Sequence, residues 1–330
     1  MTRACTVKQT REGSKLNIGV HLSLGTKPGT SVAQAAGAGA TCLQIFASSP
    51  GAWKAPLLHE DKTEQLRAAV AEHGMHPLVI HAIYLINLAS PDPVLRRRSI
   101  QSLQAAMEAA AALGAMGVVT HLGSHSGRGF EAVAGTIASG LRQVIETAPD
   151  RVALILENNA GAGGLVGAQL EELAALIAFA GSSRRLLVAL DTAHLCGAGW
   201  DLAADGEGER LVEAIRLTFG LDRLALIHAN DSAAVCGSRR DRHAVVGEGH
   251  IGLAGFACLL AQGEIRRLPW ILETPDLDPS RRDGEQWVSI RRLRALAADS
   301  SLASRPGSTP EAVPASTAPA PEDKLDTIDA

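Results

Sequence analysis

Short apolar runs alternate along most of the chain with longer stretches whose apolar residues recur at the spacing of an α-helix. The apolar runs predict eight β-strands, over residues 17–21, 42–46, 77–81, 118–121, 152–157, 186–191, 224–228 and 270–273. The stretches between and after them predict helices, a small one through Val32 and Ala36 and longer ones over residues 60–73, 94–113, 131–147, 170–180, 202–219, 253–260 and 285–297.

Eight successive strand–helix units are the pattern of a (β/α)8 TIM barrel, an α/β fold. A doubly wound open sheet is the alternative, but no GxGxxG turn follows the first predicted strand. We expect one barrel domain over residues 16–298, preceded by a flexible leader over residues 1–15. From residue 299 onward Ser, Thr, Ala, Pro and acidic residues replace large apolar ones, which predicts a disordered tail over residues 299–330.

Composition agrees with this architecture and indicates the compartment. Hydrophobic residues make up 46% of the chain and aromatic residues only 3%, which suits helices packed closely on parallel strands. The five cysteines form no CxxC pair, so the sequence indicates neither a disulfide framework nor a thiolate zinc site. Because no apolar run reaches 18 residues and no secretory signal opens the chain, we expect a cytoplasmic protein with no membrane contact. We also expect a monomer.

The net charge of −4 belongs to the tail rather than to the predicted barrel. Residues 299–330 hold six acidic and two basic residues, which leaves the rest of the chain neutral. Bound divalent cations would make that neutral body positive. Net charge therefore neither supports nor excludes a phosphate-bearing ligand such as DNA.

Candidate metal ligands follow six of the predicted strands, one in each strand–helix unit. They are His81, His121, Glu157, Asp191, His228 and Glu273. His194 lies three residues after Asp191, and the connection after the seventh strand adds Asp241 and His243. A closed parallel barrel brings the carboxyl ends of its strands to one rim, where barrel enzymes carry their active sites. We therefore expect all nine side chains to meet there.

The residue types of this set indicate a metal centre. Glu157 and Glu273 end strongly apolar runs, and a buried carboxylate is costly unless a cation compensates its charge. Imidazoles and carboxylates without thiolates favour zinc, with manganese or iron as alternatives. Nine ligands exceed one tetrahedral site, so the set suits two or three ions. Such clusters activate water and hold the oxygens of a phosphoester during in-line displacement.

Six segments resemble the motifs of the endonuclease IV family of zinc-dependent abasic-site endonucleases. They are HAIYLINLA at residues 81–89, LENNAG at 156–161, DTAH at 191–194, HANDS at 228–232, GSRRDRH at 237–243 and GEGHIG at 247–252. The resemblance runs from about Asn17 to Ala297. It implies cleavage of duplex DNA on the 5′ side of abasic sites in base excision repair, with removal of 3′ blocking groups as a candidate second activity.

The same resemblance implies three zinc ions and assigns their ligands. His81 and His121 would hold the first ion and share Glu157 with the second. Asp191, His228 and Glu273 would complete the second site, and His194, Asp241 and His243 would form the third. Glu273 would orient the attacking hydroxide, so Glu273, Glu157 and Asp191 are the catalytic candidates.

The resemblance also suggests residues that contact DNA and two departures that weaken the contact. Tyr84 and Leu85 would enter the duplex from the minor groove and hold the abasic nucleotide out of the stack. Arg242 would contact a phosphate, and Trp53 is a further candidate. Gly51 stands where the family usually carries an arginine that fills the gap in the base stack, and Ala233 stands where a lysine is frequent. We therefore expect weaker binding of abasic DNA with the metal chemistry intact.

Two other functions remain open on the sequence alone. A metal-dependent sugar isomerase or epimerase of the same barrel type also collects His, Glu and Asp at strand ends. A non-catalytic DNA-damage-binding protein would account for Gly51 and Ala233, although binding alone does not require nine ligands. His21, His125 and His250 also lie near strand ends or motif loops, and we expect structural or supporting roles for them.

Overall fold

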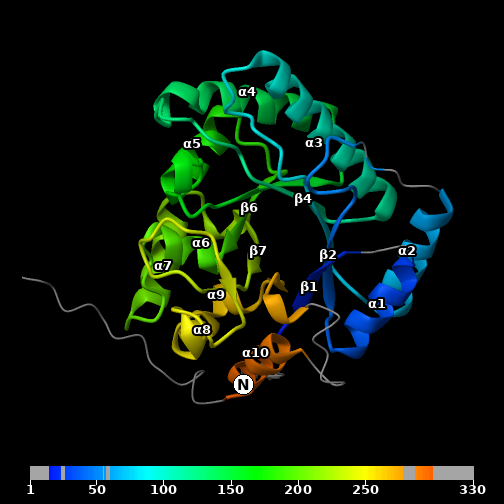
Figure 1. Ribbon diagram of the computed structural model, residues 1–330, viewed down its shortest axis with the longest axis vertical. Helices are drawn as coiled ribbons and strands as arrows, with labels where there is room; N and C mark the ends of the chain where they lie inside the picture. Colours follow the sequence, from blue (N-terminus) through cyan, green and yellow to red (C-terminus); the bar gives the residue numbers. More distant parts are fainter. Residues whose placement is uncertain (1–14, 24–26, 55, 57–59, 278–286, 300–330) are drawn as a thin grey trace, which may run out of the picture.

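The computed structural model describes residues 15–23, 27–54, 56, 60–277 and 287–299 (Figure 1). Apart from Lys15 and Asp299, the predicted leader and tail lie outside the described residues. Within the described part of the chain, no helix is both long and apolar enough to cross a membrane.

Eight parallel strands close into a barrel, which confirms the predicted fold class. The strands are β1 (Ile18–Leu22), β2 (Cys42–Phe46), β3 (Leu78–His81), β4 (Gly117–Thr120), β5 (Ala153–Glu157), β6 (Leu186–Asp191), β7 (Leu224–His228) and β10 (Trp270–Leu272). Their order around the barrel is β1-β10-β7-β6-β5-β4-β3-β2, so the last strand pairs with the first. Each strand lies within one or two residues of its predicted range.

Helices surround the barrel, as Figure 1 shows. They are α1 (Pro28–Gly37), α2 (Glu60–Glu72), α3 (Pro93–Leu113), α4 (Glu131–Thr147), α5 (Leu170–Phe179), α6 (Thr192–Ala198), α7 (Glu207–Leu217), α8 (Gly252–Ala261), α9 (Gly263–Arg266) and α10 (Val288–Ala298), with 3-10 turns η1 (Ala162–Gly164), η2 (Leu221–Arg223) and η3 (Pro275–Leu277). Helix α3 ends at Gly114, whose φ of 70° is the left-handed conformation expected of a C-cap glycine.

Two predicted regions differ from the structure. In place of the single helix expected over residues 202–219, the structure has α7, which covers only part of that range. Helix α6, which was not expected, precedes α7 and starts directly after β6. Asp191 makes this possible, because its side chain caps α6 by accepting a hydrogen bond from the His194 N–H at 2.9 Å. The expected loop over residues 229–249 contains an antiparallel pair of two-residue strands, β8 (Asp231–Ser232) and β9 (His243–Ala244).

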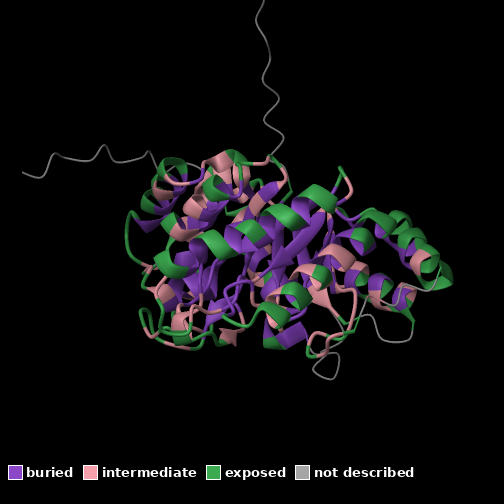
Figure 2. Cartoon of the chain, turned by 90° about the horizontal axis from the view of Figure 1, so that it is seen from above, coloured by how far each residue is buried: buried purple, intermediate pink, exposed green. Residues whose placement is uncertain are grey.

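The core has two layers because side chains alternate between the two faces of every strand. One set faces the helices and includes Leu43, Ile80 and Leu154. The other fills the barrel and consists of Cys42, Val79, Val119, Ala153, Ile155, Ala189, Leu226 and Ile271. Figure 2 shows the buried strands at the centre and exposed residues on the outer faces of the helices. Because side chains alternate, the residue two positions after a barrel-facing residue also faces the inside of the barrel.

Candidate metal centre

One polar side chain from each strand points inward at the carboxyl end of the barrel. These eight residues, called here the rim ring, are His21, Gln44, His81, His121, Glu157, Asp191, His228 and Glu273. The alternation of the strands places them: Glu157 follows Ile155 by two residues and His228 follows Leu226, and both predecessors fill the barrel. The structure thus brings together all six predicted strand-end ligands and adds His21 and Gln44.

Glu157 lies at the centre of one group of imidazoles. Its Oε2 is 3.2 Å from His81 Nε2 and 3.5 Å from His121 Nε2. Its Oε1 is 2.9 Å from His228 Nδ1 and 3.5 Å from His194 Nδ1. Only 1% of Glu157 is exposed, so these imidazoles, rather than water, surround its two oxygens. The position suits a carboxylate that two cations share.

A second group lies around Asp241 and shares His194 with the first. One oxygen of Asp241 is 3.2 Å from His194 Nε2, and the other is 3.2 Å from His243 Nε2. His243 Nε2 also lies 3.6 Å from Asp191 Oδ2. The connection that contains β9 therefore brings Asp241 and His243 close to His194, which lies on α6.

Three sets of side chains are close enough for one cation each. Ligand atoms within 4.8 Å of one another occur in His81, His121 and Glu157, in Glu157, Asp191, His228 and Glu273, and in Asp191, His194 and His243. The first two sets coincide with the predicted first and second ligand groups. The third set contains Asp191 together with His194 and His243, two of the three residues predicted for the third ion. The remaining predicted ligand, Asp241, contacts both of these histidines.

The hydrogen bonds of the histidines fit the donor set of a metal centre. A ligating histidine usually donates from one ring nitrogen to a protein acceptor, which leaves the other nitrogen for the metal. His81 Nδ1 lies 2.7 Å from the Ala82 carbonyl, and His194 Nδ1 lies 3.0 Å from the Asn158 carbonyl. His243 Nδ1 lies 3.2 Å from the Glu273 carbonyl. In each ring the opposite nitrogen, Nε2, faces the carboxylates.

Charge pairing within the centre shifts the pKa values of its groups strongly. Burial alone would raise the pKa of Glu157, but attraction to His121 and His228 outweighs it and holds that pKa well below its usual range. Burial opposes protonation of His194, yet Asp191 and Asp241 raise its pKa to about 10. Glu157 is therefore ionised at neutral pH, and His194 carries a positive charge that a bound cation would replace.

Two asparagines support the carboxylates. The amide of Asn158 accepts from the Asp191 N–H at 2.6 Å and donates to the Asp191 carbonyl at 3.2 Å. The amide of Asn230 donates to Asp191 Oδ2 at 2.6 Å, and its oxygen accepts from the Glu273 N–H at 2.8 Å. Sequence reasoning missed both residues, although each lies within a motif segment and is buried.

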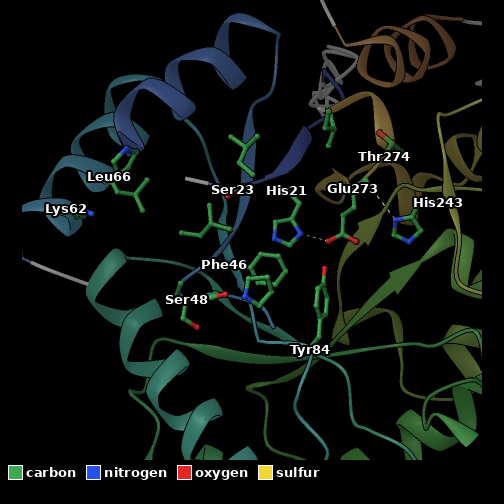
Figure 3. Close-up of a pocket in the computed structure, with 17 residues that line it drawn as sticks. His21, Ser23, Phe46, Ser48, Lys62, Leu66, Tyr84, His243, Glu273 and Thr274 are labelled. Carbon is green, nitrogen blue, oxygen red and sulfur yellow. Dashed lines mark hydrogen bonds and ion pairs between the residues drawn. The ribbon is translucent and has the colours of Figure 1, made fainter. Parts of the chain in front are cut away.

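A cavity of 720 Å³ opens beside Glu273 (Figure 3). Its wall includes His21, Phe46 and Tyr84, and His243 and Thr274 lie on its other side. The ring centroids of Phe46 and Tyr84 are 5.3 Å apart, and Tyr84 is 59% exposed. A ligand in this cavity would meet Glu273 and an aromatic wall at once.

The four predicted DNA-contact residues lie in different settings. Tyr84 stands at the cavity, and Leu85 is half-buried against the core. Arg242 is exposed, and its guanidinium donates to the Asp241 carbonyl at 2.6 Å. Trp53 is half-buried, with the Arg98 guanidinium 4.8 Å from its ring centroid. One face of the Trp53 ring thus already contacts a cation of α3.

Known proteins resemble this chain along most of its length. The chain is 38% identical over 282 residues to a protein called probable endonuclease 4 from Natronomonas pharaonis, and the match covers 85% of this chain and 98% of that relative. A probable endonuclease 4 from Natranaerobius thermophilus is also 38% identical, over 281 residues, with 85% and 98% covered.

Solved structures and a family model extend the comparison. Endonuclease IV from Thermus thermophilus is 34% identical and superposes with a TM-score of 0.74, covering 85% of this chain and 98% of that chain. A D-tagatose 3-epimerase-like protein, 20% identical with a TM-score of 0.63, shares the fold. Residues 32–296 match the model of the xylose isomerase-like TIM barrel family. The chain belongs to the endonuclease IV family within these barrels.

Proposed function

We propose that the protein is a zinc-dependent endonuclease that cuts duplex DNA on the 5′ side of abasic sites. The observation that carries the proposal is the rim ring with its three ligand sets, in a chain 38% identical to proteins called probable endonuclease 4. Those names support a nuclease, that is, a phosphodiester hydrolase. Imidazole and carboxylate ligands without thiolates support zinc.

The nine predicted ligands would divide among three ions. His81, His121 and Glu157 would hold the first, and Glu157, Asp191, His228 and Glu273 the second. His194, Asp241 and His243 would hold the third. Bound zinc would supply Lewis acidity toward the phosphoester oxygens and positive charge that offsets the carboxylates and the developing transition state.

Glu273 is the residue best placed to take the proton of the attacking water. His21 Nδ1 and Gln44 Nε2 occupy its Oε1, at 2.6 and 2.7 Å. Its Oε2 faces inward instead, 3.8 Å from His228 Nδ1 and 3.4 Å from Asn230 Nδ2. A carboxylate held in this way presents one oxygen to the attacking water, as a positioned base requires.

The surroundings of the centre support DNA as the substrate. Tyr84 is exposed at the mouth of the cavity, where a ring can stack on a base or enter a duplex. Arg242 lies between the ligands Asp241 and His243, so a phosphate held by the third ion would lie within its reach. We propose the same centre for removal of 3′ blocking groups, because that reaction breaks the same type of phosphoester bond.

One assay tests the proposal. Purified protein is incubated with a labelled duplex that contains one abasic site, and strand scission is followed beside an undamaged duplex while zinc per chain is measured. We expect a cut on the 5′ side of the abasic site and about three zinc ions per chain. Binding without scission would favour a damage-binding protein, and sugar turnover without scission would favour an isomerase. Either result would overturn the proposal.

A further inference from the structure

Gln44 completes the rim ring and has no role in the predicted ligand sets. It lies on β2, in register with His21 of β1 and Val79 of β3. Its side chain faces the barrel interior, two residues after Cys42, and none of it is exposed to solvent. A fully buried amide in an apolar strand is costly unless hydrogen bonds satisfy both its ends.

The amide of Gln44 joins two residues of the second ligand set. Its Nε2 lies 2.7 Å from Glu273 Oε1, and its Oε1 lies 2.9 Å from His228 Nε2. The orientation of the amide follows from chemistry, because an ionised carboxylate only accepts hydrogen bonds and must therefore face the NH2 group. The carbonyl oxygen then faces His228, so His228 Nε2 must carry a proton.

This arrangement decides which atoms of the two ligands face the centre. With its Nε2 donating to Gln44, His228 directs Nδ1 toward Glu157 Oε1, at 2.9 Å. Gln44 and His21 together occupy Glu273 Oε1, so Oε2 is the oxygen left for the centre. One amide therefore sets both the ring nitrogen of His228 and the carboxylate oxygen of Glu273 that point inward.

We propose that Gln44 is a positioning residue that fixes the tautomer of His228 and the orientation of Glu273 for the second cation site. The inference rests on the proposed function, since it concerns the same centre. Neither an apolar side chain nor a carboxylate could replace Gln44 in both contacts. An apolar side chain would leave His228 Nε2 without its acceptor, and a carboxylate would repel Glu273.

The test compares Gln44→Met, which keeps the size of the side chain and removes both hydrogen bonds, with wild type. Leu43→Met is the matched control, because Leu43 is equally buried on the same strand but faces the helices. Three quantities are measured: zinc affinity by chelator competition, kcat and KM on an abasic duplex, and the ring ¹⁵N shifts of His228 in the metal-free protein at high pH, where the ring is neutral and its tautomer is defined.

For Gln44→Met we expect zinc affinity at one site and kcat each to fall about 10- to 100-fold, the usual effect of losing such support. KM should stay unchanged, because a fully buried Gln44 side chain cannot reach a bound DNA. The fraction of neutral His228 that carries its proton on Nε2 should fall. A merely structural role for Gln44 would not cause this change. Leu43→Met should match wild type in all three measurements.

A second variant separates the two contacts. In Gln44→Glu the new carboxylate still accepts from His228 Nε2 but repels Glu273, so we expect the tautomer to persist while zinc affinity and kcat fall. It also carries the test if Gln44→Met does not fold. Wild-type values for zinc, kcat and tautomer in both folded variants would overturn the inference. If wild type itself neither binds zinc nor cuts DNA, the proposed function fails, whereas the His228 tautomer still tests the role of Gln44.

Discussion

The two oxygens of Glu273 have different partners, and this difference predicts the effect of one substitution. In Glu273→Gln, Oε1 can still accept from His21 and Gln44, which leaves the new NH2 group at the position that faces the centre. That group can neither bind a cation nor take a proton. We expect kcat on abasic duplex to fall about 10²- to 10⁴-fold, the range for loss of a general base.

Glu248→Gln is the control for this measurement. Glu248 is an exposed carboxylate on the connection between β7 and α8 and pairs with Arg292 at 3.0 Å, a surface contact of little energetic weight. It should cut at the wild-type rate. A Glu273→Gln protein that also cuts at that rate would remove Glu273 from the mechanism.

Gly51 is a position where an added side chain meets no obstacle. A Cβ built there has nothing within 4 Å, and no left-handed φ restricts the residue. We expect Gly51→Arg to tighten binding of abasic duplex roughly tenfold, as one charge-assisted contact of about 1.5 kcal/mol would do. Fluorescence anisotropy with abasic and undamaged duplexes at one salt concentration measures it.

The control for Gly51→Arg adds the same charge elsewhere. Gly135 lies exposed on α4, and a Cβ there also has nothing within 4 Å. Gly135→Arg should change the affinity for both duplexes only slightly. Equal gains from both variants would mean that net charge alone, not the place of Gly51, accounts for the tighter binding.

The site was predictable from the sequence where its residues carry charge or an imidazole at a strand end. His81, Glu157 and Asp191 each end an apolar run, so strand periodicity and residue type together identified them. The sequence did not identify Gln44 as a site residue, because it lies in the middle of its strand and an amide is common in many structural settings. Only the pairing of β1 with both β2 and β10, which single-sequence patterns do not give, brings it to Glu273.

Asp231 organises the connection between β7 and α8, the element that carries Asp241 and His243. Its two buried oxygens accept hydrogen bonds from backbone N–H groups at 2.8 to 3.3 Å; the donors are Ser232, Gly247, Gly249, Ile251 and Gly252. These bonds fold the segment on both sides of β9 around one carboxylate. The third ligand set therefore depends on a residue that belongs to none of the three sets.

We expect Asp231→Asn to lower the free energy of unfolding by about 2–3 kcal/mol, because an NH2 group would face backbone N–H donors. The amount of zinc bound per chain should fall, because the connection would no longer hold His243 in position for the third ligand set. Thermal denaturation and metal analysis measure both effects, with Asp222→Asn as a control that removes a charge far from the centre. An Asp231→Asn protein with wild-type stability and zinc content would contradict the role of Asp231.

Element boundaries were predictable where an element is long enough to show its period. Helix α4 and strand β2 match their predicted ranges, since each has a sustained apolar pattern. The β8–β9 pair was missed because two-residue strands show no alternation. Helix α6 was missed because it is short and starts without a loop, with Asp191 serving as both strand end and N-cap.

At the scale of the whole molecule, ion pairs and hydrogen bonds of the rim ring link all eight strands of the barrel. In the absence of a cation, imidazoles and carboxylates neutralise one another there. Burial opposes protonation of His228 and His243, but carboxylates outweigh it: Glu273 and Glu157 raise the pKa of His228 to about 9, and Asp191 and Asp241 do the same for His243. Protons and cations therefore compete for one set of ligands.

This competition gives the metal-free and zinc-loaded proteins opposite pH dependences. Raised histidine pKa values contribute stability that is complete below the ordinary value of 6.5 and is lost as pH rises toward about 9 or 10. The lowered pKa values of Glu157 and Glu273 contribute stability that is present above their ordinary value of 4.5 and is lost as pH falls through the lowered values. Burial lowers the pKa values of His21 and His121, so their contribution is lost as pH falls below 6.5. The metal-free protein should thus have its highest Tm near the ordinary histidine value of 6.5.

Zinc binds the deprotonated imidazoles, so the rise in Tm that zinc causes should grow between about pH 6 and pH 8. At a free zinc concentration about 100 times Kd, one site contributes about 2.7 kcal/mol, or roughly 5 °C for a domain of this size. Calorimetry of chelator-treated protein with and without added zinc, at constant ionic strength, measures the difference. A rise that stays constant across this range, or shrinks, would show that protons and zinc do not share the rim ring.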